Sequence, residues 1–141
     1  MFEKFERFSM SKAAIARLFK VAVAFVVTGA VSGAAVWIWA VANGAIALGG
    51  PQFVTFNPAT IGGAIVGLTV ASLLTSAGTV AAVVSWAGAL LNTSRLENKT
   101  WFITLLGLGL VSLGWVAMIA YIVKGPEDAS LAATRAATAA S

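Results

Sequence analysis

The chain has 141 residues, of which 60% are hydrophobic and 10% are charged, and its formal net charge is +4. Soluble domains have about 45–50% apolar and about 25% charged residues, so this composition indicates an integral membrane protein. Cysteine and histidine are absent, which excludes disulfides, thiolate catalysis, cysteine zinc sites, histidine-ligated haem and a histidine base. The basic residues flank apolar segments instead of forming a stripe, so nucleic acid is not an expected partner.

Residues 21–94 contain no Asp, Glu, Lys, Arg or His. A run of this length is stable only in lipid or against other protein. More than half of the chain therefore lacks the side chains that perform acid–base, metal and ion-pair chemistry. We therefore predict a membrane protein without a catalytic, cofactor or metal site.

Residues 1–20 are basic and contain phenylalanines at every third position from Phe2 to Phe8. This pattern predicts a short amphipathic helix at the membrane surface, and the alternative is a solvated positive anchor. Ser11 is the expected N-cap of a helix that enters the bilayer from Lys12.

The first predicted span covers residues 21–48. Its length exceeds the about 20 residues that a helix needs to cross the hydrocarbon core. It is also longer than the apolar region of a signal peptide, which has about 7–15 residues. We therefore expect an uncleaved anchor, which ends at Gly49-Gly50-Pro51 because proline cannot continue a helix.

The second predicted span covers residues 58–91, with Asn57 as N-cap and Pro58 at the first helical position. The polar cluster at 75–79 allows an alternative, two short spans joined by a turn at Gly78. Each half would be too short to cross, and the turn would leave backbone donors unpaired in lipid. One long helix is therefore favoured.

A polar loop at 92–99 precedes the third predicted span, residues 100–123, which a Gly-Pro stop at 125–126 ends. The tail 125–141 is rich in Ala and Thr and is predicted to be a loose helix or disordered. The predicted fold is an all-α integral membrane domain over 21–124 with three long transmembrane helices. Four shorter spans are the alternative.

With three spans, seven Lys or Arg residues lie on the side of the N-terminus and two on the other. The positive-inside rule then places the N-terminus in the cytoplasm and the C-terminus outside. A topology with four spans also places seven Lys or Arg residues on one side and two on the other. The distribution of charge therefore does not distinguish three spans from four. The expected interfacial anchors are the aromatic residues Trp37, Trp39, Trp86, Trp101 and Tyr121. Trp115 falls inside a span, where it is expected to pack against a helix or a lipid chain.

In the three-span topology, residues 40–48 and 58–70 extend beyond the hydrocarbon core. Both stretches are apolar and uncharged. An exposed apolar patch normally marks a contact with another protein, although helix tilt absorbs part of such a mismatch.

Small residues recur one helical turn apart. Close helix packing in lipid uses such residues. The candidates are Gly29 and Gly33 in the first span, Gly63, Gly67 and Ala71 in the second, and Gly107, Gly114 and Ala117 in the third. In segments this rich in Gly and Ala, the spacing also arises by chance.

Ser72, Ser76 and Thr79 share one helix face by their spacing. They suggest a hydroxyl-lined path, and the alternative is hydroxyls that bond to the helix backbone. The second interpretation is favoured because ion and proton paths usually contain an intramembrane carboxylate, which is absent here.

Residues 85–127 combine a tryptophan, a short charged loop and an apolar span that contains glycines. The pattern resembles the two-helix membrane segment at the N-terminus of phospholipase D-type proteins. The matching residues are Trp86, Lys99, Trp101, Gly114, Tyr121 and Gly125. In that family the segment is an anchor and the catalytic His–Lys–Asp motif lies elsewhere. The resemblance therefore implies a membrane hairpin and no lipase activity.

Taken together, these patterns predict a non-catalytic accessory, stabilising or assembly subunit of a larger bacterial inner-membrane complex, respiratory or transport. Its expected partners are membrane lipids and larger membrane subunits that contact its apolar helix faces. The alternative is a small self-associating channel or transporter.

Overall fold

The computed structural model describes residues 10–48, 54–95, 99–126 and 129–141. The chain is mostly helical and divides into two compact units. One unit is Val21–Ala81, which we call the helix-pair unit. The other combines Met1–Lys20 with Ala82–Ser141. Because it contains every ionisable side chain of the sequence, we call it the charged unit.

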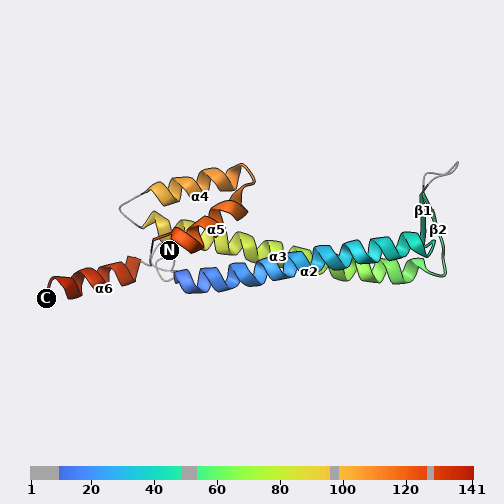
Figure 1. The fold of residues 1–141 in the computed structure, drawn as a ribbon, viewed down its shortest axis with the longest axis horizontal. Coiled ribbons are helices and arrows are strands. Elements are labelled where there is room, and N and C mark those ends of the chain that lie inside the picture. The colour runs from blue at the N-terminus through green and yellow to red at the C-terminus, as the bar shows by residue number, and fades with distance from the viewer. Residues whose placement is uncertain (1–9, 49–53, 96–98, 127–128) are drawn as a thin grey trace, which may run out of the picture. The chain divides into compact units, whose positions relative to one another are not determined.

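The first long helix, α2, spans Lys12–Ala42 (Figure 1). Ser11 is its N-cap, as predicted, because its Oγ accepts a hydrogen bond from the Ala14 amide at 3.2 Å. Residues 12–20 are therefore the first turns of α2, as expected for a helix that begins at Lys12. The interfacial location of residues 1–20 stays a prediction. Residues 1–9 lie outside the described part of the chain.

The predicted extension of the first helix to residue 48 is wrong, because α2 ends at Ala42. Gly44 has a φ of 68°, a left-handed conformation that glycine adopts without steric cost and that stops the helix. Two short strands follow, β1 (Ile46–Leu48) and β2 (Val54–Phe56). They pair antiparallel, with Ile46 opposite Phe56. A buried cluster at this end joins the strands to the helices and consists of Ala40, Ala45, Ile46 and Ala64.

The second long helix, α3, spans Ile61–Ser94 without interruption. It therefore matches the single long helix favoured by the sequence, and it has no turn at Gly78. The predicted start of this helix at Pro58 is wrong, because residues 58–60 form a turn and α3 begins at Ile61. Asn57 holds the turn, since its Oδ1 accepts the Ala59 amide at 3.0 Å and its carbonyl accepts the Ile61 amide at 2.9 Å. Within the helix-pair unit, α2 and α3 lie side by side and run antiparallel (Figure 1).

The predicted third long helix is wrong, because residues 100–123 form two shorter helices. These are α4 (Thr100–Leu110) and α5 (Gly114–Lys124), which pack against each other as a hairpin (Figure 1). Ser112 has a φ of 63° at the turn. The Leu113 amide bonds to the Leu108 carbonyl at 2.9 Å and the Ser112 amide to the Gly109 carbonyl at 3.3 Å. These two bonds form a Schellman motif, which ends α4.

After the hairpin, the predicted Gly-Pro stop is present. Helix α5 ends at Lys124, and Gly125 is extended. In the tail, α6 spans Ala129–Ala139, which corresponds to the helical alternative of the prediction.

Among the described residues, α2 and α3 are long and apolar enough to cross a membrane. Only 11% of the most apolar stretch of α2 and 17% of that of α3 is buried. Core helices of soluble proteins are mostly buried, so these two helices do not resemble them. Helices α4 and α5, with 11 residues each, are shorter than the about 20 residues of a crossing helix.

Substituting Ser112 by glycine is expected to stabilise the chain by about 0.5–1 kcal/mol, because the left-handed conformation costs a non-glycine residue about 1–2 kcal/mol. The measurement is the unfolding midpoint in detergent, followed by tryptophan fluorescence. Ser112→Ala is the control and should change stability little, because alanine also carries a Cβ. A loss of stability in Ser112→Gly would contradict the described turn.

Candidate functional site

The first candidate site is the line of contact between α2 and α3 in the helix-pair unit, which we call the seam. A Cβ atom on Gly29 would lie 2.8 Å from the backbone nitrogen of Thr75 and 2.9 Å from the carbonyl oxygen of Ala71. A Cβ on Gly33 would lie 3.4 Å from the Cβ of Ala71. The two backbones therefore approach as closely as small residues allow.

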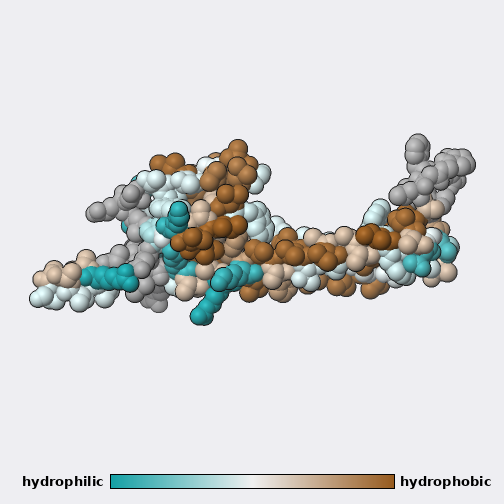
Figure 2. Space-filling view, in the orientation of Figure 1, coloured by the Kyte–Doolittle hydropathy of each residue, from teal (hydrophilic) through white to brown (hydrophobic). Residues whose placement is uncertain are grey.

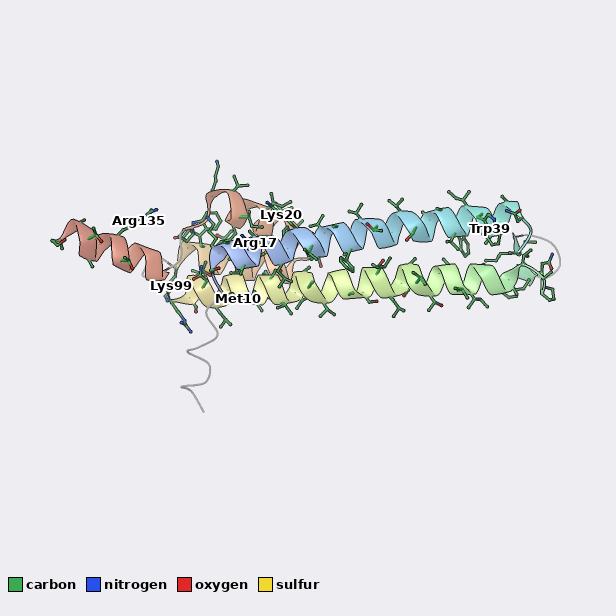
Figure 3. The ribbon with its side chains drawn as sticks, turned by 90° about the horizontal axis from the view of Figure 1, so that it is seen from below. Met10, Arg17, Lys20, Trp39, Lys99 and Arg135 are labelled. Carbon is green, nitrogen blue, oxygen red and sulfur yellow. The ribbon has the colours of Figure 1, made fainter. Side chains whose placement is uncertain are left out.

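The seam continues toward the strands through the other small residues of α3. A Cβ on Gly67 would lie 2.8 Å from a methyl group of Val36, and one on Gly63 would lie 3.5 Å from the Trp39 ring. Trp39 is at the end of α2 (Figure 3).

Gly78 also belongs to the seam, and sequence reasoning did not select it. A Cβ there would lie 2.8 Å from both the Ala22 carbonyl oxygen and the Val26 backbone nitrogen. The signal for this position was its spacing, because Gly78 follows Ala71 by two helical turns on the same face.

The glycines of α4 and α5 occupy a different environment. A Cβ on Gly107 would meet nothing within 4 Å, and one on Gly114 would meet only the Gly109 Cα, at 3.6 Å. Gly109, which was not predicted, lies against the Trp86 ring, 2.5 Å from the place of its missing Cβ. Gly107 therefore has no packing partner among the described residues.

The three hydroxyl residues Ser72, Ser76 and Thr79 are exposed on α3. Thr79 donates to the Thr75 carbonyl at 2.8 Å, which is the backbone bonding that the alternative interpretation expected. Thr75, by contrast, lies in the seam and donates to the Ala71 carbonyl at 2.9 Å. A single chain therefore does not enclose a path lined by the three hydroxyls.

The second candidate site is a buried polar cluster in the charged unit, which we call the Tyr121 cluster. Tyr121 is fully buried, and its hydroxyl accepts a hydrogen bond from Asn92 Nδ2 at 2.7 Å. The Trp101 ring packs edge-on at a centroid distance of 6.2 Å. The Lys12 ammonium lies 5.8 Å from the ring centroid and donates to the Gly125 carbonyl at 2.6 Å.

The sequence predicted Tyr121 as an interfacial anchor, and its position in the structure differs. Tyr121 is not an exposed interfacial anchor, since its ring is inside the charged unit. The buried side chain has suitable partners, because its hydroxyl is hydrogen-bonded and a cation lies over the face of its ring. The cluster ties together the first turn of α2, the end of α3 and the end of α5.

The tryptophans differ in exposure. Trp37 and Trp39 are exposed on α2, whereas Trp86 is half-buried and donates from Nε1 to the Leu105 carbonyl at 3.0 Å. Trp86 therefore anchors α4 to α3 within the charged unit. Trp115 packs against Phe19, with ring centroids 5.4 Å apart, in agreement with the expected contact to another helix.

All five acidic residues of the sequence lie outside the described ranges, and no three metal-ligating side chains come together within them. The groups present in the two candidate sites hold helices together through packing, hydrogen bonds and one cation–π contact.

No protein-family model matches the chain, and no curated protein or solved structure shows significant similarity to it. The resemblance of residues 85–127 to the phospholipase D-type membrane segment thus stays a prediction.

Proposed function

We propose that this chain is a non-catalytic integral membrane protein that serves as an accessory, stabilising or assembly subunit of a larger bacterial membrane complex, respiratory or transport. The observation that carries the proposal is the apolar outer surface of the helix-pair unit (Figure 2). Large exposed hydrophobic side chains cover it, among them Val31, Ile38, Ile65, Val66, Leu73 and Val80. Soluble monomers rarely expose contiguous apolar patches larger than a few hundred Å².

The dimensions of the helix-pair unit support a place in the bilayer. Residues 21–42 of α2 and 61–81 of α3 each measure roughly 32 Å at 1.5 Å per residue, close to the about 30 Å of a hydrocarbon core. The apolar extension of a helix over residues 40–48 beyond the hydrocarbon core is therefore not needed, because these residues form the end of α2 and the first strand. We therefore propose that partner subunits contact the outer faces of α2 and α3 within the bilayer of the bacterial inner membrane.

The test is extraction in a mild detergent followed by native mass spectrometry. The subunit proposal expects this chain to migrate with larger, different chains at a fixed stoichiometry. Recovery as a homo-oligomer that conducts or transports in liposomes would overturn it.

A second candidate is a small channel or transporter formed by self-association. The exposure of Ser72, Ser76 and Thr79 favours this reading, since copies that meet on that face of α3 would enclose the hydroxyls. Liposome flux that the Ser72→Val and Ser76→Val substitutions abolish would support it. Unchanged flux in these variants would exclude a path along this face.

A further inference from the structure

We propose that the chain crosses the membrane only twice, and that the charged unit, with both ends of the chain, lies on the cytoplasmic side. The inference rests on the membrane location proposed above, in which residues 21–42 and 61–81 cross the hydrocarbon core. It replaces the third crossing of the sequence-based topology by a hairpin that stays on the side of the N-terminus.

The first support is the return of the chain within the hairpin. In a single helix through the membrane, residues 101 and 121 would lie roughly 30 Å apart at 1.5 Å per residue. The rings of Trp101 and Tyr121 instead pack at a centroid distance of 6.2 Å. Each helix of the hairpin has 11 residues and is roughly 16 Å long, about half of the hydrocarbon core. Neither helix is long enough to cross, and the second returns to the start of the first.

The second support is the attachment of the hairpin to segments that border the two crossing stretches. The Trp115 ring packs on the ring of Phe19, which lies just before the crossing stretch of α2, at a centroid distance of 5.4 Å. Trp86, just after the crossing stretch of α3, donates from Nε1 to the Leu105 carbonyl at 3.0 Å, and its ring lies against Gly109. Both helices of the hairpin are therefore held by parts of α2 and α3 that lie outside the crossing stretches.

The third support is the return of the end of α5 to the start of α2. Lys12 Nζ donates to the Gly125 carbonyl at 2.6 Å, and Asn92 Nδ2 donates to the Tyr121 hydroxyl at 2.7 Å. A crossing by residues 100–123 would instead separate residue 125 from residues 12 and 92 by about 30 Å of hydrocarbon. Helix α6 follows with 11 residues, which is fewer than the about 20 of a crossing helix. The C-terminus therefore stays on the side of residue 12.

The two crossing stretches also lead into the charged unit from the same end of the helix pair. A Cβ atom on Gly78 would lie 2.8 Å from both the Ala22 carbonyl oxygen and the Val26 backbone nitrogen. The start of one crossing stretch therefore lies beside the end of the other. Residues 20 and 82, which continue these stretches, emerge on the same face of the membrane.

The two-crossing topology concentrates the positive charge. All nine Lys and Arg residues lie on one side, whereas the connection at 43–60 contains no ionisable residue. The sequence-based topologies gave seven against two. Nine against none is a stronger positive-inside signal, and it assigns the charged unit to the cytoplasm. Arg17 and Lys20, which are exposed just before the crossing stretch of α2, are then available to the anionic headgroups of the cytoplasmic leaflet (Figure 3).

The test uses pairs of cysteines, which need no background substitutions because the sequence contains no cysteine. The 141-residue chain is reconstituted into sealed liposomes, a membrane-impermeant maleimide is added outside, and the labels on each molecule are counted by intact mass. In the Ala13→Cys/Ser141→Cys variant, both altered positions are exposed. Each molecule is expected to carry two labels or none, whichever way it is inserted. One label on each molecule would place the two positions on opposite sides and overturn the proposal.

Ala13→Cys/Ala47→Cys is the matched control, because residue 47 is exposed in β1, between the two crossings. Each molecule of this variant is expected to carry one label. Two labels on every molecule of both variants would mean that neither stretch crosses, which would refute the membrane location itself. One label in both variants would instead refute the two-crossing topology alone, so the two failures are distinguishable.

The cytoplasmic assignment is tested with single-cysteine variants in oriented membrane vesicles. Ser141→Cys is expected to react with the maleimide only in inside-out vesicles, and Ala47→Cys only in right-side-out vesicles. The reverse pattern would place the charged unit outside the cell and overturn the assignment to the cytoplasmic side.

Discussion

Substitution of Gly29 by alanine is expected to destabilise the helix-pair unit by about 1–3 kcal/mol, the usual cost of overpacking a close contact. The added Cβ would lie 2.8 Å from the Thr75 backbone nitrogen and 2.9 Å from the Ala71 carbonyl oxygen. Neither atom can turn away as a flexible side chain would, so α2 and α3 must separate along the seam. The measurement is denaturant-induced unfolding in detergent micelles, followed by tryptophan fluorescence.

Gly107→Ala is the matched control, because it makes the same chemical change inside a helix where a Cβ meets nothing within 4 Å. Alanine is favoured over glycine in a helix interior by about 1 kcal/mol, so this variant is expected to gain stability. A loss of stability in Gly29→Ala and a gain in Gly107→Ala would show that the loss comes from the close contact at the seam. Equal effects in the two variants would mean that the approach of α2 to α3 at Gly29 does not hold the pair together.

Local sequence signals predicted the helix limits that depend on one or two residues. Ser11 caps α2 through its own side chain, and Gly125-Pro126 ends α5 because proline lacks the amide proton. Asn57 holds the turn that precedes α3. The uninterrupted course of α3 through Gly78 was also predictable. Its Ser and Thr hydroxyls can bond to the preceding turn, so the polar cluster does not break the helix.

The turn between α4 and α5 escaped prediction because its left-handed position is occupied by Ser112 instead of glycine. The hydropathy of 100–123 is continuous, and a pattern of apolar residues does not distinguish one long helix from two short ones. Only the bonds of Leu113 and Ser112 back to α4, together with the packing of α5 against α4, define the hairpin.

The burial of Tyr121 could not be predicted from the sequence for a related reason. Aromatic residues near the end of an apolar segment are usually interfacial anchors, and the sequence of α5 alone fits that role. The partners that bury Tyr121 come from residues 12, 92 and 101, which lie in three other helices. Such contacts depend on tertiary structure and leave no local pattern.

Substitution of Tyr121 by alanine is expected to destabilise the charged unit by about 3–5 kcal/mol, the range for large aromatic truncations in a packed core. The ring is fully buried and contacts both Trp101 and the Lys12 ammonium, so its removal leaves a cavity and an uncovered cation. The change is measured by the same unfolding assay and by protease cleavage after Lys124, which should accelerate as the end of α5 is released.

Tyr121→Phe is the control that separates the ring from its hydroxyl. It keeps the packing and the cation–π contact and removes only the oxygen that accepts the Asn92 amide, at an expected cost of about 1–2 kcal/mol. If both variants lost the same stability, the hydrogen bond and not the ring would hold the cluster. A larger loss in the alanine variant, with faster cleavage after Lys124, would assign to the ring the attachment of α5 to the first turn of α2. That attachment keeps residue 125 beside residue 12, where the Lys12 ammonium donates to the Gly125 carbonyl.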